Sequence, residues 1–117
     1  YIPTKLDANK MKEAIKYFEG EHDFKGFKAS GTSSKSSVRV IYETKIKVEG
    51  ERIVIELTGN GFLYNMVRII AGTLVEVGEG RRSLADVKQA LSTGERKKAG
   101  PTAPPEGLVL VEIREVP

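Results

Sequence analysis

The chain of 117 residues has no cysteine and a single histidine, His22. It can therefore form no disulfide and carry out no thiol chemistry. Zinc sites made of cysteine and histidine are excluded, and so is a Ser-His-Asp triad unless another chain contributes. The absence of cysteine fits a reducing compartment, and we expect a cytoplasmic protein.

Long apolar runs are also missing. The longest uncharged run after Arg68 is 69–75, which is too short to span a bilayer. No signal peptide is visible, and we expect no membrane partner. The chain begins with Tyr1 rather than Met and opens as if in mid-sequence, so we expect a piece of a larger protein.

The composition is that of an ordinary globular domain. Hydrophobic residues make up 39% of the chain and charged residues 30%, and the length suits one domain with a real core. The formal net charge of +3 is compatible with RNA, but many proteins without a nucleic-acid role share it. No segment is a basic tail, so a basic surface would have to be assembled by folding.

Hydrophobic periodicity predicts six elements in the chain. They are a helix from an N-cap at Asp7 to Gly20, strands over 38–48 and 52–59, helices over 62–77 and 83–94, and a strand over 108–113. Between them, 21–27 is typical of a turn and 28–37 of a flexible loop.

The patterns of the strands predict how they are placed. In the first strand, one face should be formed by Val38, Val40, Tyr42, Ile46 and Val48. The segment 108–113 is apolar on both faces, which is typical of a central strand. Only one strand follows the helices, so the chain is assigned to the α+β class, with a mixed or antiparallel sheet and helices packed on one side.

Arg68 stands out because no other residue of 57–75 is ionisable at neutral pH. On a helix it would have Ala71 and Gly72 beside it, which are small enough for backbone or a ligand to approach closely. The helix face that carries Arg68 is either exposed to solvent or paired with an anion supplied from elsewhere. The second alternative arises because an unpaired buried charge costs several kcal/mol. The residues alone leave both readings open. The opposite face should be core: Leu63, Met66, Val67, Ile70 and Leu74.

Other motifs have a plainer alternative beside the functional one. The segment 59–61 follows a strand, but it lacks the third glycine of a dinucleotide loop, which favours a tight turn. The pair His22-Asp23 fits acid-base chemistry or a turn with local hydrogen bonds. Phe24 and Phe27 fit base stacking or the core.

Two stretches near the C-terminus are candidates for RNA contact. Arg96, Lys97 and Lys98 suit either phosphate binding or the exposed end of a loop, and 81–82 carries a similar pair of arginines. The proline-rich segment 99–107 is either a connector or a rigid wall of an active site.

Three stretches together, HDFKGF, GNGFLYNMVRIIAGTLVEVGEG and AGPTAPPEGLVLVEI, resemble the carboxy-terminal half of A-type tRNA pseudouridine synthases. The resemblance covers roughly residues 22–113. It implies an isomerase that acts on uridine in the anticodon stem-loop of tRNA without a metal or cofactor. It also implies a homodimer whose α+β halves surround a shared sheet and a basic cleft.

The resemblance implies a role for three residues. Arg68 matches the arginine that pairs with the catalytic aspartate, which lies in the amino-terminal half of the family. Leu108 matches an apolar residue near the target uracil, and Arg39 matches a basic position that we assign to RNA contact.

The chain departs from the family in one respect that decides activity. Its aspartates are Asp7, Asp23 and Asp86, and none stands in the catalytic context. We therefore expect residues 1–117 to be the C-terminal domain, with the amino-terminal half absent and the fragment inactive alone. The alternative is a non-catalytic RNA-binding or protein-interaction module with an RRM-like sheet, although the hairpin strands lack the aromatic pair that such sheets use.

Overall fold

The computed structural model describes residues 6–28, 36–50, 52–63, 65–96, 99–101 and 109–116. Its α-helices are α1 (Ala8–Ile15), α2 (Met66–Gly78) and α3 (Leu84–Thr93), with two short 3-10 turns, η1 (Lys16–Phe18) and η2 (Lys25–Phe27). Its strands are β1 (Gly20–Asp23), β2 (Val38–Glu49), β3 (Arg52–Gly59) and β4 (Val109–Glu115). The RNA-contact candidates Lys97 and Lys98, and Leu108, lie outside the described residues.

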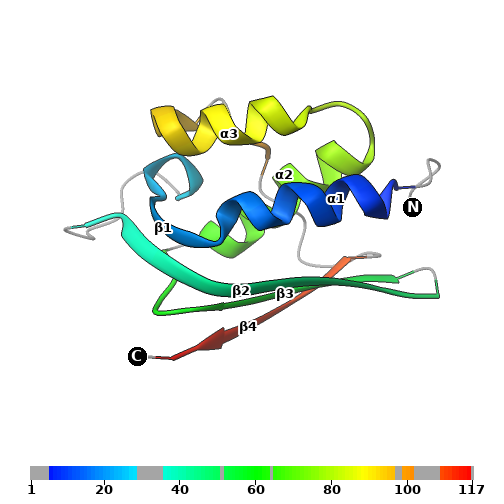
Figure 1. The fold of residues 1–117 in the computed structure, drawn as a ribbon, viewed down its shortest axis with the longest axis horizontal. Coiled ribbons are helices and arrows are strands. Elements are labelled where there is room, and N and C mark those ends of the chain that lie inside the picture. Colours follow the sequence, from blue (N-terminus) through cyan, green and yellow to red (C-terminus); the bar gives the residue numbers. More distant parts are fainter. Residues whose placement is uncertain are drawn as a thin grey trace.

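The strands form one mixed sheet in the order β1-β2-β3-β4. The pairs β1–β2 and β2–β3 are antiparallel, whereas β4 runs parallel to β3. Figure 1 shows α1, α2 and α3 on the same side of this sheet. The predicted α+β class, with a mixed sheet and helices on one side, is confirmed. Within the described residues, no helix is both long and apolar enough to cross a bilayer.

Local capping signals fix three of the helix ends where the sequence predicts them. The Asp7 side chain accepts a hydrogen bond from the Lys10 backbone, and Ser83 with Asp86 forms a capping box. Gly94 ends α3 at a φ of 69°, a conformation that glycine adopts without strain. The predicted end of the first helix at Gly20 is wrong, because the α-helix stops at Ile15, a 3-10 turn follows, and Gly20 begins β1.

The predicted turn over 21–27 is wrong in its first part. Gly20–Asp23 pairs with β2 as an edge strand, and a 3-10 turn follows at Lys25–Phe27. Phe24 and Phe27 are fully buried and pack against Phe18, with ring centroids 6.5 and 5.2 Å from it. They therefore belong to the core, and base stacking by them is ruled out in this conformation.

The predicted inner face of β2 is wrong because the strand contains a bulge. The register shifts between Ile41 and Glu43, so Tyr42 is an extra residue and the alternation changes phase there. Ile41, Thr44 and Ile46 are buried, whereas Tyr42 is 49% exposed. Of the five residues predicted on the inner face, only Ile46 is buried.

The helix predicted over 62–77 begins four residues later, at Met66. Asn65 has a φ of 59°, which lies in the left-handed region and cannot continue a right-handed helix backward. Every residue from Ile69 to Leu74 is buried, including Thr73 at 0% exposure. The core therefore surrounds α2 on most of its circumference.

The predicted central position of the last strand is wrong within the described sheet. β4 lies at the edge, paired on one side only, with β3. Its apolar residues are consequently left accessible, with Leu110 41% and Ile113 50% exposed. This edge strand thus exposes one apolar side chain on each face, Leu110 on one and Ile113 on the other.

Candidate functional site

Arg68 lies in the first turn of α2 and is half-buried. Its small neighbours Ala71 and Gly72 lie one turn further along the helix and are both buried, so the helix surface beyond Arg68 is covered. The predicted core residues Leu63, Met66, Ile70 and Leu74 are buried, and Val67 is half-buried. The side chain of Arg68 is therefore attached near the N-terminal end of a densely packed helix.

The segment that leads into this turn is tied to two strands. The Gly59 carbonyl accepts a hydrogen bond from Val116 N at 2.9 Å, beyond the end of β4. A Cβ on Gly59 would lie 2.7 Å from the Val40 carbonyl oxygen of β2, so only glycine fits there. The segment 59–61 is thus a tight strand-to-helix connection, the plainer of its two interpretations.

Arg39 lies beside the same connection. Its Nε would lie 3.5 Å from a Cβ on Gly61, and its Nη1 donates to the carbonyls of Ser36 and Val38 at 3.0 and 2.8 Å. The structure thus places two of the predicted site residues, Arg39 and Arg68, at the two ends of one connection.

Other predicted candidates are held by local contacts. Arg96 donates to the Gly100 carbonyl at 2.8 Å, and Gly100 N donates to Thr73 Oγ1 at 2.7 Å, which ties this loop to α2. Arg82 pairs with Glu76 at 2.7 Å. Both arginines are thus held by partners in or beside the helix layer.

The pair His22-Asp23 also makes local hydrogen bonds. The His22 Nε2 lies 2.9 Å from the Glu19 carbonyl oxygen, and Asp23 accepts from Lys25 N at 3.1 Å. The two side chains thus make local hydrogen bonds to different partners, as the plainer interpretation expects, although they lie in β1 rather than in a turn. In the described residues, no cluster of three or more histidine or acidic side chains could hold a metal ion.

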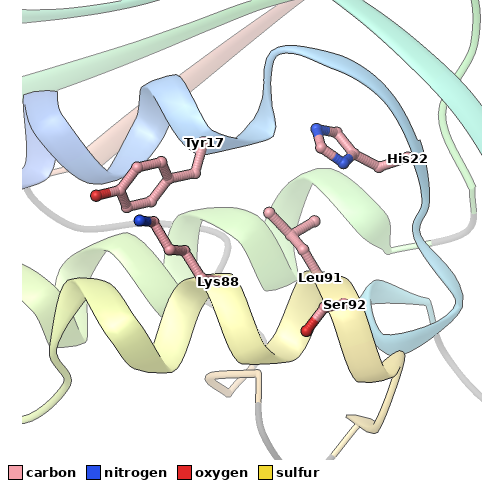
Figure 2. Close-up of a pocket in the computed structure, with 5 residues that line it drawn as sticks. All are labelled: Tyr17, His22, Lys88, Leu91 and Ser92. Atoms are coloured by element: carbon pink, nitrogen blue, oxygen red, sulfur yellow. The ribbon is translucent and has the colours of Figure 1, made fainter.

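A hollow of about 230 Å³ lies between η1, β1 and α3, lined by Tyr17, His22, Lys88, Leu91 and Ser92. Figure 2 shows Leu91 extending from α3 toward the space between Tyr17 and His22. The Lys88 ammonium lies 4.8 Å from the centre of the Tyr17 ring, a cation–π contact. The hollow is smaller than the usual range for ligand pockets, about 300–1,000 Å³, and its imidazole and ammonium already have partners. We interpret it as a packing gap between η1, β1 and α3 rather than as a ligand site.

Sequence reasoning missed two polar contacts that join distant segments. Glu19 Oε2 accepts hydrogen bonds from Thr44 N and Thr44 Oγ1 at 2.9 and 2.7 Å. Burial raises the pKa of Glu19, but hydrogen bonds from Thr44 and Lys16 outweigh it and leave the pKa below its ordinary value. Asn60 Oδ1 accepts from Val40 N at 2.9 Å. Neither contact has a periodic signal, although an asparagine between two glycines is a hint.

Comparison with known proteins gives a consistent result. A family model described as tRNA pseudouridine synthase matches residues 14–114. The chain is 47% identical over 113 residues to tRNA pseudouridine synthase A 2 of Clostridium perfringens, covering 97% of the chain and 46% of that relative. The tRNA pseudouridine synthases A of Acetivibrio thermocellus and Thermoanaerobacter sp. are each 48% identical, with the same coverage. The chain thus spans about half the length of the curated relatives that it matches.

Proposed function

The chain belongs to the tRNA pseudouridine synthase family, and on this premise we propose that residues 1–117 are the C-terminal domain of an enzyme that converts uridine into pseudouridine in the anticodon stem-loop of tRNA. The reaction is an isomerisation. The bond between uracil N1 and ribose C1′ breaks, the base turns, and C5 becomes bonded to C1′, with loss of the C5 proton and gain of one at N1. The target base must leave the stack before it can be reached.

The aspartates of the chain support a site shared with another half of the protein. The Asp7 carboxylate caps α1 by accepting from Lys10 N, and that of Asp86 accepts from Ser83 N at 2.9 Å. Asp23 accepts from Lys25 N in the turn after β1. All three carboxylates are therefore occupied in shaping local structure, and we place the catalytic carboxylate in the amino-terminal half.

The observation that carries the proposal is the position of Arg68. It is the one charged residue of 57–75, and it lies half-buried in the first turn of a helix whose next charged residue is Glu76, two turns further on. A guanidinium beside a carboxylate favours the ionised form of the acid and holds it in a bidentate geometry. We assign to Arg68 the orientation of the catalytic aspartate, and to Leu108 and Arg39 contacts with uracil and RNA.

The open edge of β4 supports a place for the missing half. Among the strands that the structure describes, β4 pairs with β3 alone, and Leu110 and Ile113 are 41% and 50% exposed. A partner strand at this edge would complete the backbone pairing and cover apolar side chains. We propose that the amino-terminal half continues the sheet at this edge.

We also propose that the complete enzyme is cytoplasmic and forms a homodimer. Sedimentation analysis of the complete parent protein tests the dimer.

The RNA-binding module is the weaker alternative. Sheets of that type stack two or three bases on aromatic side chains. Among the described strand residues, the only tyrosine, phenylalanine or tryptophan is Tyr42, the bulged residue of β2.

Replacement of Arg68 in the complete parent protein tests the proposed role. We expect Arg68→Ala to lower kcat on the order of 10²–10⁴-fold while tRNA affinity changes little, because the loss concerns the reacting groups. Arg68→Lys should rescue poorly, since lysine lacks the bidentate guanidinium. Tritium release from C5-labelled tRNA measures turnover, and filter binding measures affinity.

A matched control is Arg52→Ala, which removes an exposed arginine at the start of β3. Its kcat should equal that of the wild type. A near wild-type rate for Arg68→Ala would contradict the role of Arg68, and a parent protein that forms no pseudouridine would contradict the proposed function itself.

A further inference from the structure

Asn60 ends the pairing of β3 with β2 in an unusual way. Asn60 N donates to the Val40 carbonyl at 3.0 Å, and Val40 N donates to Asn60 Oδ1 at 2.9 Å. In a regular antiparallel ladder the second bond would go to the backbone carbonyl of the paired residue. Here the side-chain amide takes the place of that carbonyl, so the backbone is free to turn away after a single residue.

The glycines on either side make this turn possible. Gly59 allows β3 to approach Val40 closely, and Gly61 has a φ of 153°, which is rare for residues with a side chain. The Arg39 side chain lies against Gly61. The chain thus leaves the sheet for the helix layer at a point defined by Asn60.

The turn is connected to Arg68 through buried groups. Leu63, three residues after Asn60, is only 5% exposed and is fixed in the core. Met66 N donates to the Leu63 carbonyl at 3.0 Å, and Leu63 N donates to Met66 Sδ at 3.4 Å. Met66 is the first residue of α2, and Arg68 lies in the same turn. Leu63 and the first turn of α2 are thus joined by two hydrogen bonds, and Asn60 fixes the chain to β2 three residues before this unit.

We infer that Asn60 is a positioning residue of the pseudouridine-forming site, because its amide fixes the connection that aims Arg68. This inference rests on the proposed function. It concerns the geometry of Arg68 rather than contact with RNA. A displacement of about 1 Å at a reacting group can lower turnover on the order of 10²-fold.

The test uses the complete parent protein and a double-mutant cycle. Asn60→Ala should lower kcat by about 10- to 100-fold with an unchanged KM for tRNA, because Val40 N loses its acceptor. Asn60→Asp should restore most of the rate, since its carboxylate can still accept from Val40 N. In an Arg68→Ala background, Asn60→Ala should lower kcat by less than about a further twofold. Asn60 acts through Arg68, so without the arginine there is no side chain left for it to position.

Thr44→Val is the matched structural control. It removes the hydrogen bond from Thr44 Oγ1 of β2 to Glu19 Oε2, which lies on the edge of β2 opposite to Asn60. This loss should lower stability without changing kcat. If Asn60→Ala fails to fold, Asn60→Gln, which moves the amide by one carbon, takes its place in the cycle with the same expectations.

Three results would overturn the inference: full additivity with Arg68→Ala, no rescue by Asn60→Asp, or an equal fall in kcat for Thr44→Val. If Arg68→Ala alone leaves kcat unchanged, the assigned role of Arg68 fails instead.

Discussion

At the scale of single residues, Glu19 and Lys16 complete the edge of β2 where β1 is absent. β1 pairs with β2 only as far as Gly20 and Ile41. Beyond that point, Thr44 N donates to Glu19 Oε2 at 2.9 Å and the Thr44 carbonyl accepts from Lys16 Nζ at 2.8 Å. Two side chains thus satisfy backbone groups of Thr44 on the edge that faces away from β3, where no β1 residue pairs with it.

Glu19→Gln should destabilise the protein by about 1–3 kcal/mol, the usual range for hydrogen bonds to a charged group. The pKa of Glu19 is lowered in the folded state, so its ionised form adds stability above the unfolded-state pKa, and this contribution is lost as the pH falls through the folded-state pKa. The stability difference from the wild type should therefore be constant above about pH 5 and shrink below pH 4.5. Urea unfolding across this pH range measures it.

Glu13→Gln, an exposed change on α1, serves as the control and should alter stability by less than about 0.5 kcal/mol. A difference between Glu19→Gln and wild type that does not vary with pH would show that the carboxylate charge is not what stabilises Thr44.

Residue-level features were predictable only where the contact is local. Asp7, Ser83 and Gly94 act within four positions of themselves, and the sequence predicts all three caps. The bonds of Thr44 to Glu19 and of Val40 to Asn60 join residues 25 and 20 positions apart. No periodicity marks such pairs, because they depend on how the sheet and the connections are folded.

At the scale of elements, the bulge of β2 explains the main error in the sequence prediction. Alternation assigns faces correctly in β3, where Ile53, Ile55 and Leu57 are buried together. In β2 the extra residue Tyr42 exchanges the faces on one side of the bulge, so a pattern read across it mixes the two faces. The sequence could likewise suggest Arg39 and Arg68 one by one. It could not show that both lie beside the connection from β3 to α2, because that depends on how β2 packs against Gly61.

The contact between α2 and the segment 99–101 gives a second prediction at this scale. Thr73 is fully buried, and its Oγ1 donates to the Ile69 carbonyl at 2.8 Å and accepts from Gly100 N at 2.7 Å. Thr73→Val keeps the shape but leaves Gly100 N without its acceptor, which should cost about 1–3 kcal/mol. The free energy of unfolding from urea titration measures this loss.

Thr93→Val is the matched control, because the Thr93 hydroxyl makes the corresponding two bonds at an exposed position: it donates to the Gln89 carbonyl at 2.8 Å and accepts from Glu95 N at 3.3 Å. Water can replace these exposed bonds, so the variant should change stability by less than about 0.5 kcal/mol. Equal losses for the two variants would mean that burial of the Gly100 contact adds nothing to its contribution.

At the scale of the whole molecule, the helix layer and the sheet do not cover each other completely. The apolar pattern of 108–113 predicts a strand with neighbours on both sides, and the described fold supplies only one. This difference between the pattern and the described sheet is the observation behind the proposal that another half of the parent protein covers β4. The chain spans about half the length of the curated relatives that it matches.

The proposed completion of the sheet gives the final prediction. When the chain and the amino-terminal half of its parent are co-expressed as two polypeptides, they should purify together through the β4 edge. Ile113→Lys places a charge at that edge and should weaken the complex by at least about tenfold, since a desolvated, unpaired charge costs several kcal/mol. Val48→Lys is the matched control, because Val48 is 54% exposed, close to the 50% of Ile113, and lies on β2, which β3 separates from β4. Equal weakening by both lysines would indicate a general loss of stability, and an Ile113→Lys complex of wild-type affinity would place the other half away from β4.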